Sequence, residues 1–256
     1  MRRLFRTTAV VALASLALCP LPLAAQAGAQ QAAQTGQVRQ IGQSRQGQAA
    51  ANNPDRWEPA IQKFEDQDKV SPPMQGGVVF VGSSSIVRWN LPESFPELGT
   101  RAINRGFGGS LIADSVRYAD RIVIPYKPRI VVFYAGDNDI VTSETADQIA
   151  AEFPKFVDKV HAALPQTRVI FISIKPSIQR WAAVDKGRAA NAIVKKYCES
   201  HANLTYLDID PKMLGPDGKP NPALLVEDGL HMTPAGYAIW NDAIRPMLKL
   251  DKGSSF

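Results

Sequence analysis

The sequence predicts an α/β fold, a three-layer α/β/α sandwich built on a central parallel sheet. Short apolar runs rich in β-branched residues alternate with amphipathic stretches of helical length, as in consecutive βαβ units. The apolar runs are continuous rather than alternating, which indicates strands buried on both faces, and such strands are typical of parallel sheets. Right-handed crossovers between them give a doubly wound topology.

Five strands and five helices follow from these patterns. The strands are expected at residues 78–81, 101–104, 130–134, 169–174 and 204–207. The helices are expected at residues 56–67, 111–122, 146–163, 186–201 and 234–248. The helix at 146–163 has the clearest pattern, because Ile149, Phe153, Phe156 and Val160 recur at the spacing of a buried helix face.

The first 27 residues have the features of a secretory signal peptide. Arg2, Arg3 and Arg6 precede an apolar stretch, and the small-residue site Ala25-Gln26-Ala27 follows it. The apolar stretch is interrupted by prolines and is shorter than the roughly 20 residues that span a bilayer. We therefore expect cleavage near Ala27, no integral membrane span after it, and a periplasmic or secreted protein.

Two further segments follow the signal peptide. Residues 28–53 are rich in Gln, Ala and Gly and contain no acidic or aromatic residue, so they are predicted to form a disordered tether. Residues 54–251 are long enough for one domain with a sizeable core.

Charge and cysteine content exclude some classes of protein. Signal cleavage removes three arginines and no acidic residue, so the net charge falls from +5 to +2. The remaining Lys and Arg residues are scattered and form no stripe, so nucleic acid is not expected as a partner. After cleavage Cys198 is the single cysteine, and no intramolecular disulfide is possible.

Four separated segments carry chemistry, and the first three each follow a predicted strand. They are Gly82-Ser83-Ser84-Ser85, Asn104-Arg105-Gly106-Phe107-Gly108-Gly109, Gly136-Asp137-Asn138-Asp139 and Asp228-Gly229-Leu230-His231. In parallel α/β sheets ligands bind beyond the carboxyl ends of the strands. Three serines compete for the role of nucleophile in the first segment.

His231 is the best candidate base among the three histidines. His161 and His201 fall on predicted helices and are interpreted as structural or solvated. His231 lies in an irregular segment, and Asp228 three residues earlier can fold back so that its carboxylate accepts from one imidazole nitrogen.

The remaining segments do not have the pattern of a cofactor site. The Gly106–Gly109 region lacks the third spaced glycine of a dinucleotide fingerprint and the Gly-Lys-Ser/Thr of a P-loop. Asp137 and Asp139 could suggest a calcium loop, but neither its glycine nor its closing glutamate follows. Neither a cofactor nor a metal is expected.

Together, the four segments in this order resemble the SGNH hydrolases, also called GDSL esterases and lipases. The resemblance implies a flavodoxin-like SGNH hydrolase fold over residues 54–251. It makes Ser84 the nucleophile, places Ser83 where the family has Asp, and leaves Ser85 at the start of a short helix. It further implies Asp228 and His231 as acid and base.

The same resemblance implies an oxyanion hole made by the backbone N–H groups of Ser84 and Gly109 and the side-chain amide of Asn138. The expected function is a serine esterase or lipase that cleaves carbohydrate or lipid acyl esters through an acyl-Ser84 intermediate. An acyltransferase using the same triad and a catalytically silent carbohydrate-binding module are the alternatives. The sequence carries no signal for the oligomeric state or for the acyl and alcohol parts of the substrate.

Overall fold

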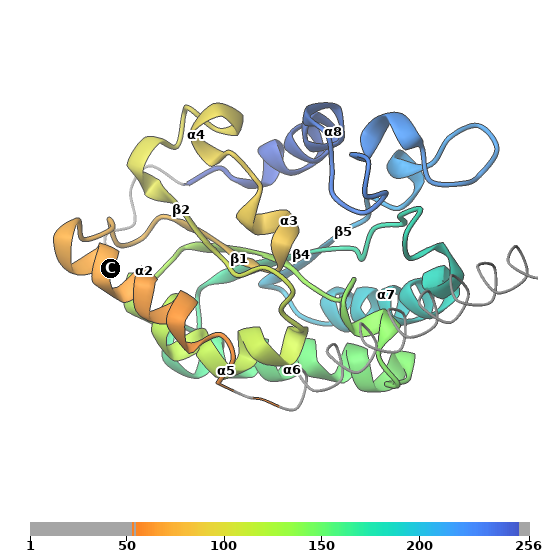
Figure 1. The fold of residues 1–256 in the computed structure, drawn as a ribbon. Helices are drawn as coiled ribbons and strands as arrows, with labels where there is room; N and C mark the ends of the chain where they lie inside the picture. Colours follow the sequence, from red (N-terminus) through yellow and green to blue (C-terminus); the bar gives the residue numbers. More distant parts are fainter. Residues whose placement is uncertain (1–52, 54, 251–256) are drawn as a thin grey trace, which may run out of the picture. The chain divides into compact units, whose positions relative to one another are not determined.

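The computed structural model describes Asn53 and residues 55–250. The predicted signal peptide and all of the predicted tether except Asn53 lie outside the described residues. The described part contains a five-stranded sheet between two layers of helices (Figure 1). The strands are β1 (Val78–Gly82), β2 (Ala102–Gly106), β3 (Ile130–Tyr134), β4 (Arg168–Ile172) and β5 (Leu204–Leu207).

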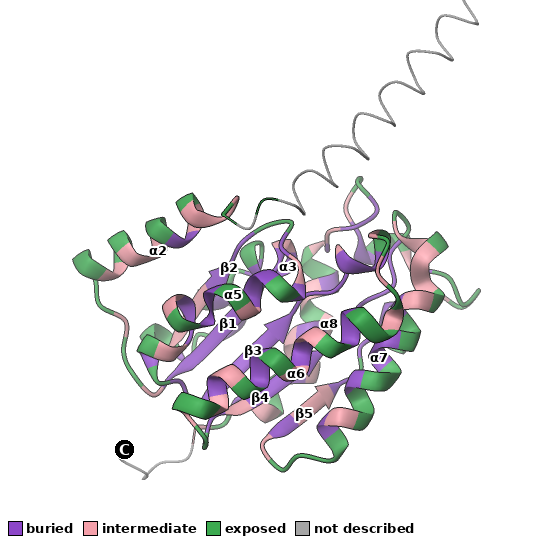
Figure 2. Ribbon diagram, turned by 90° about the horizontal axis from the view of Figure 1, so that it is seen from below, coloured by how far each residue is buried: buried purple, intermediate pink, exposed green. Residues whose placement is uncertain are grey.

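All neighbouring strands are parallel, in the order β2-β1-β3-β4-β5. Every residue of β1 and β3 is buried, because these strands lie inside the sheet and are covered on both faces (Figure 2). The chain reverses its direction of travel across the sheet between β1 and β3, and such switch points are where doubly wound folds bind ligands. The predicted three-layer α/β/α sandwich is confirmed.

One face of the sheet is covered by α5 (Ile112–Ile122), α6 (Ala146–Ala163) and α7 (Val184–Glu199). The other face is covered by α3 (Ser84–Val87), α4 (Leu91–Ser94) and α8 (Pro234–Ile244) (Figure 1). Alternate residues of a strand point to opposite faces, so Val79 and Val81 join the first core while Val78 and Phe80 join the second.

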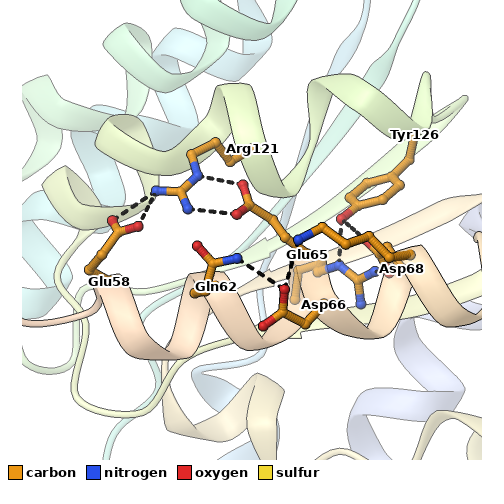
Figure 3. Close-up of polar contacts among 9 residues, drawn as sticks. Glu58, Gln62, Glu65, Asp66, Asp68, Arg121 and Tyr126 are labelled. Atoms are coloured by element: carbon orange, nitrogen blue, oxygen red, sulfur yellow. Dashed lines mark hydrogen bonds and ion pairs between the residues drawn. The ribbon is translucent and has the colours of Figure 1, made fainter.

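Helix α2 (Glu58–Val70) packs outside α5, and several charged side chains join the two helices (Figure 3). Ile61 is the only residue of this helix that is buried. The Arg121 guanidinium on α5 contacts Glu65 at 2.6 Å and Glu58 at 2.7 Å. At the other end of α2, Asp68 accepts from the Tyr126 hydroxyl at 2.5 Å. Ile61 belongs to the core on this face of the sheet, and Ala60 and Phe64 pack against that core, so apolar contacts and ion pairs together attach α2.

Some predicted boundaries are wrong by a few residues, for local reasons. The predicted helix 234–248 ends at Ile244 and continues as a 3₁₀ turn, Arg245–Met247, because Pro246 has no N–H for a helical hydrogen bond. The short helix that begins with the serines ends at Val87, and Pro92 lies in the first turn of the next helix, α4. Within the described residues, no helix is both long and apolar enough to cross a membrane.

Candidate active site

Ser84 lies at the tight turn that joins β1 to α3. Gly82 precedes it with φ +139°, and a Cβ there would lie 1.8 Å from the Tyr134 carbonyl oxygen. The same carbonyl accepts a 2.9 Å hydrogen bond from the Ser83 N–H. Ser84 is consequently the first residue of α3, where a backbone N–H has no partner within the helix.

His231 reaches the Ser84 hydroxyl from the other end of the chain. Its Nε2 lies 2.9 Å from Ser84 Oγ, and its Nδ1 lies 2.5 Å from Asp228 Oδ2. The other carboxylate oxygen of Asp228 accepts from the backbone N–H groups of Leu230 and His231, both at 2.9 Å. Gly229 allows this turn, since its φ is +65°. The predicted nucleophile, base and acid are thus brought into one hydrogen-bonded chain.

The charge state of Asp228 fixes the direction of these hydrogen bonds. Desolvation acts to raise the pKa of its carboxyl, but the hydrogen bonds from the His231 ring and from two backbone N–H groups outweigh it and hold the pKa well below the usual range. An ionised carboxylate can only accept, so Nδ1 must carry the hydrogen. Nε2 is then free to accept a proton from Ser84.

The two other predicted oxyanion donors lie in the loops after β2 and β3, which a hydrogen bond joins. Gly109 has φ +80°, and the adjoining Gly108 lies against the nucleophile, with a Cβ built there 3.7 Å from Ser84 Cβ. Asn138 Nδ2 donates to the Ser110 carbonyl at 3.0 Å. A side-chain amide has two N–H groups. One makes this hydrogen bond and orients the side chain, and the second can donate to the substrate. Among the described residues, the N–H groups of Ser84 and Gly109 have no hydrogen-bond acceptor.

The remaining members of the serine triplet face inward. Ser83 is fully buried and its hydroxyl donates to Asp137 Oδ1 at 3.2 Å. Ser85 was expected at the start of the short helix; it is the second residue of α3 and is buried. Its hydroxyl finds no hydrogen-bond partner among the described residues. Only Ser84 of the three meets His231.

Each of the other two histidines contacts a backbone carbonyl through its ring. His161 lies 2.8 Å from the Thr167 carbonyl, and His201 lies 2.8 Å from the Tyr197 carbonyl. Cys198 is buried on α7, and burial raises the pKa of its thiol to about 12. No cluster of three or more His, Cys, Asp or Glu side chains in the described region could hold a metal ion.

Asp139 has a structural task beside Asn138. Its Oδ1 accepts the Ile112 N–H at 3.0 Å, which joins the turn after β3 to the start of α5. Burial raises the pKa of this carboxyl to about 8.

Two neighbours of the site were missed in the sequence. Trp57, which directly precedes α2, lies over the loop, with its Cη2 3.4 Å from where a Gly109 Cβ would be. Its indole N–H donates to Asp114 at 3.1 Å. Lys175, in the loop after β4, is buried beneath the turns that carry Ser84 and Asn138, 3.7 Å from Asp137 Oδ2. Nothing local marks either one: tryptophans are common in cores, and lysines are rarely buried.

The chain is similar in sequence to known lipases and acylhydrolases. The sequence model of the GDSL-like Lipase/Acylhydrolase family matches residues 83–239. The chain is similar to human (Homo sapiens) platelet-activating factor acetylhydrolase IB subunit alpha1, with 28% identity over 186 residues that cover 71% of this chain and 78% of the relative.

Solved structures share the fold. A GDSL-like lipase from Bacteroides thetaiotaomicron superposes with a TM-score of 0.64 at 20% identity, over 73% of this chain and 96% of the other. A carbohydrate esterase family 3 protein from Talaromyces cellulolyticus superposes with a TM-score of 0.54 at 21% identity, over 68% of this chain and 96% of the other.

Proposed function

Since the chain belongs to the GDSL-like lipase/acylhydrolase family, we propose that it hydrolyses carboxylic esters through an acyl-Ser84 intermediate. Ester hydrolysis itself follows from the family. The proposal of Ser84 as nucleophile rests on one observation, the continuous hydrogen-bonded chain from Asp228 through His231 to the Ser84 hydroxyl. That arrangement is what an activated serine requires.

The reaction would run in two halves. Ser84 Oγ attacks the ester carbonyl carbon while His231 Nε2 takes its proton, and Asp228 stabilises the imidazolium. The carbonyl oxygen becomes negative and accepts from the N–H groups of Ser84 and Gly109 and from the Asn138 amide. Collapse releases the alcohol, which takes the proton from His231. Water then attacks the acyl-serine by the same route and releases the acid.

A small acyl group, such as acetyl, on a carbohydrate or lipid alcohol is the substrate class that we propose. The support for acetyl is the name of the human relative, an acetylhydrolase. Trp57 would limit the space beside the oxyanion loop, because its ring already contacts the position of a Gly109 Cβ. The proposed location is the periplasm or the exterior, on the grounds of residues 1–27.

The central experiment compares Ser84→Ala with Ser85→Ala. Purified protein is assayed on p-nitrophenyl acetate, butyrate and octanoate, on acetylated xylan and on an acetylated lysophospholipid. Ser84→Ala should lower kcat by about 10⁴-fold or more. Ser85→Ala should stay near wild type, because its hydroxyl contacts no reacting group.

Labelling with an organophosphonate probe locates the nucleophile. Mass spectrometry should find the adduct on Ser84; an adduct on Ser83 or Ser85 would move the nucleophile by one residue and refute this assignment. A polyol acceptor added to the assay separates the alternatives, since an acyltransferase would form the acylated polyol in place of free acid. Folded protein that is inactive on every ester would favour the silent binding module.

A further inference from the structure

A buried charge pair lies beneath the turns that carry the proposed oxyanion donors. Lys175 Nζ is 3.7 Å from Asp137 Oδ2, and both side chains are almost completely shielded from solvent, at 0% and 2% exposure. Within the described part of the chain neither of these two atoms makes a hydrogen bond. Burying two charges is costly, and no step of the proposed reaction uses Lys175.

The second oxygen of Asp137 connects this pair to the site. It accepts the Ser83 hydroxyl at 3.2 Å. Ser83 directly precedes Ser84, and Asp137 directly precedes Asn138. This one hydrogen bond therefore ties the segment that carries the Ser84 N–H to the segment that carries the Asn138 amide.

Ser83 stands where the resembling family has an aspartate. The carboxylate that Ser83 contacts here belongs to Asp137, in the turn after β3. The sheet order puts β1, β3 and β4 side by side, so Ser83, Asp137 and Lys175 come from the carboxyl ends of three adjacent strands.

Several groups face the Lys175 ammonium. Burial lowers its pKa, the carboxylates of Asp137 and Asp228 act in the opposite direction, and the Arg180 guanidinium adds to the lowering. The Tyr134 ring lies 6.0 Å from Nζ. Asp137 is the acidic group in ion-pair contact with the ammonium, so it is the partner on which the charge acts most directly.

We propose that Lys175 is a positioning residue for ester hydrolysis. Its ammonium is the counter-charge of the Asp137 carboxylate that accepts from Ser83, and the Ser83–Asp137 bond holds the Ser84 and Asn138 donors in one fixed arrangement. This inference rests on the proposed function. Fixed donors matter because they must already point to where charge develops in the transition state.

Ser83→Ala tests the bond, and Ser85→Ala is its matched control, a buried neighbouring serine whose hydroxyl has no partner among the described residues. Turnover is measured per active site by titration with the phosphonate probe, so unfolded protein does not count. Ser83→Ala should lower kcat by about 10- to 100-fold, as expected of misplaced reacting groups, with KM within about twofold because substrate binding is not changed. Equal kcat in the two variants would overturn the proposal.

Lys175→Met and its rescue test the charge. The single variant leaves Asp137 buried without a counter-charge and should lose both stability and kcat. Asp137→Asn added to Lys175→Met retains an acceptor for Ser83 that needs no counter-charge, so kcat should recover by about tenfold or more over the single variant. Wild-type kcat per titrated site in Lys175→Met, or no recovery in the double variant, would overturn the proposal.

The Ser84→Ala variant separates this inference from the proposed function. If Ser84→Ala remains active, the proposed function fails. If it is inactive while Ser83→Ala matches Ser85→Ala, only the positioning role of Asp137 and Lys175 fails.

Discussion

Replacing Gly109 by Ala tests the oxyanion loop through a change of one methyl group. Gly109 has φ +80°, and a Cβ there would touch the Trp57 ring at 3.4 Å. The left-handed conformation costs an alanine about 1 to 2 kcal/mol, of which roughly 0.4 to 1 kcal/mol is offset because alanine restricts the unfolded chain. The net loss is about 1 kcal/mol, or roughly 2 to 4 °C in Tm for a domain of this size.

Gly218→Ala is the matched control for that backbone cost. Gly218 also has positive φ, at +72°, and a Cβ there would meet nothing within 4 Å. It lies in a turn that contributes no residue to the site. Both variants should therefore lose about the same stability by thermal melting.

Activity should separate the two variants. Relief of the strain at Gly109 moves a donor that must lie about 2.7 to 3.1 Å from the oxyanion. We expect kcat/KM on p-nitrophenyl acetate to fall by about 10²-fold in Gly109→Ala, and to stay near wild type in Gly218→Ala. Equal activity in the two variants, with both folded, would refute the role of the Gly109 N–H.

Three further predictions concern charged groups. Asp228→Asn should keep the fold and lower kcat by roughly 10⁴-fold, because an amide can hold the imidazole in the wrong tautomer; a loss below tenfold in steady-state assays would make Asp228 structural. The folded pKa of Asp139, raised by burial to about 8, means that the unfolded chain ionises first. The free energy of unfolding should then fall as pH rises from about 4 to 8, and urea titrations of Asp139→Asn should show a weaker fall. Arg121→Met removes the contacts to Glu58 and Glu65 and should cost about 1 kcal/mol or less, with a difference that shrinks in 1 M NaCl.

Much of the fold could be predicted because short stretches of sequence determine where the strands and helices lie. The strands at Ile130–Tyr134 and Leu204–Leu207 were placed with their observed bounds, since continuous apolar runs mark them. The end of α8 was misplaced because the periodic pattern continues through Pro246, which cannot continue the hydrogen bonding.

The site residues that could be predicted are those whose type and spacing in the sequence indicate their chemistry. The residues whose role depends on being buried could not be predicted. Asp228 and His231 lie three residues apart, so their contact is local. The tie between Asp137 and Lys175 joins turns from different strands, and a lysine in sequence gives no sign that its ammonium is enclosed. The burial of Ser85 was not predicted for a similar reason, because it depends on how α3 packs on the sheet.

Ser84 and His231 are 147 residues apart in the sequence, so the catalytic site is complete only when the segment after the last strand has docked on the sheet. The sheet is complete at Leu207, before the segment that carries the base. That segment is anchored by its own contacts, a bridge between Leu225 and Met232 and a hydrogen bond from the Thr233 N–H to Leu224. During refolding, a species with the native sheet can therefore hold a serine that is not yet nucleophilic. The rate at which Ser84 becomes reactive toward a phosphonate would measure the docking of the last segment. The change in circular dichroism would measure the formation of the sheet and its helices.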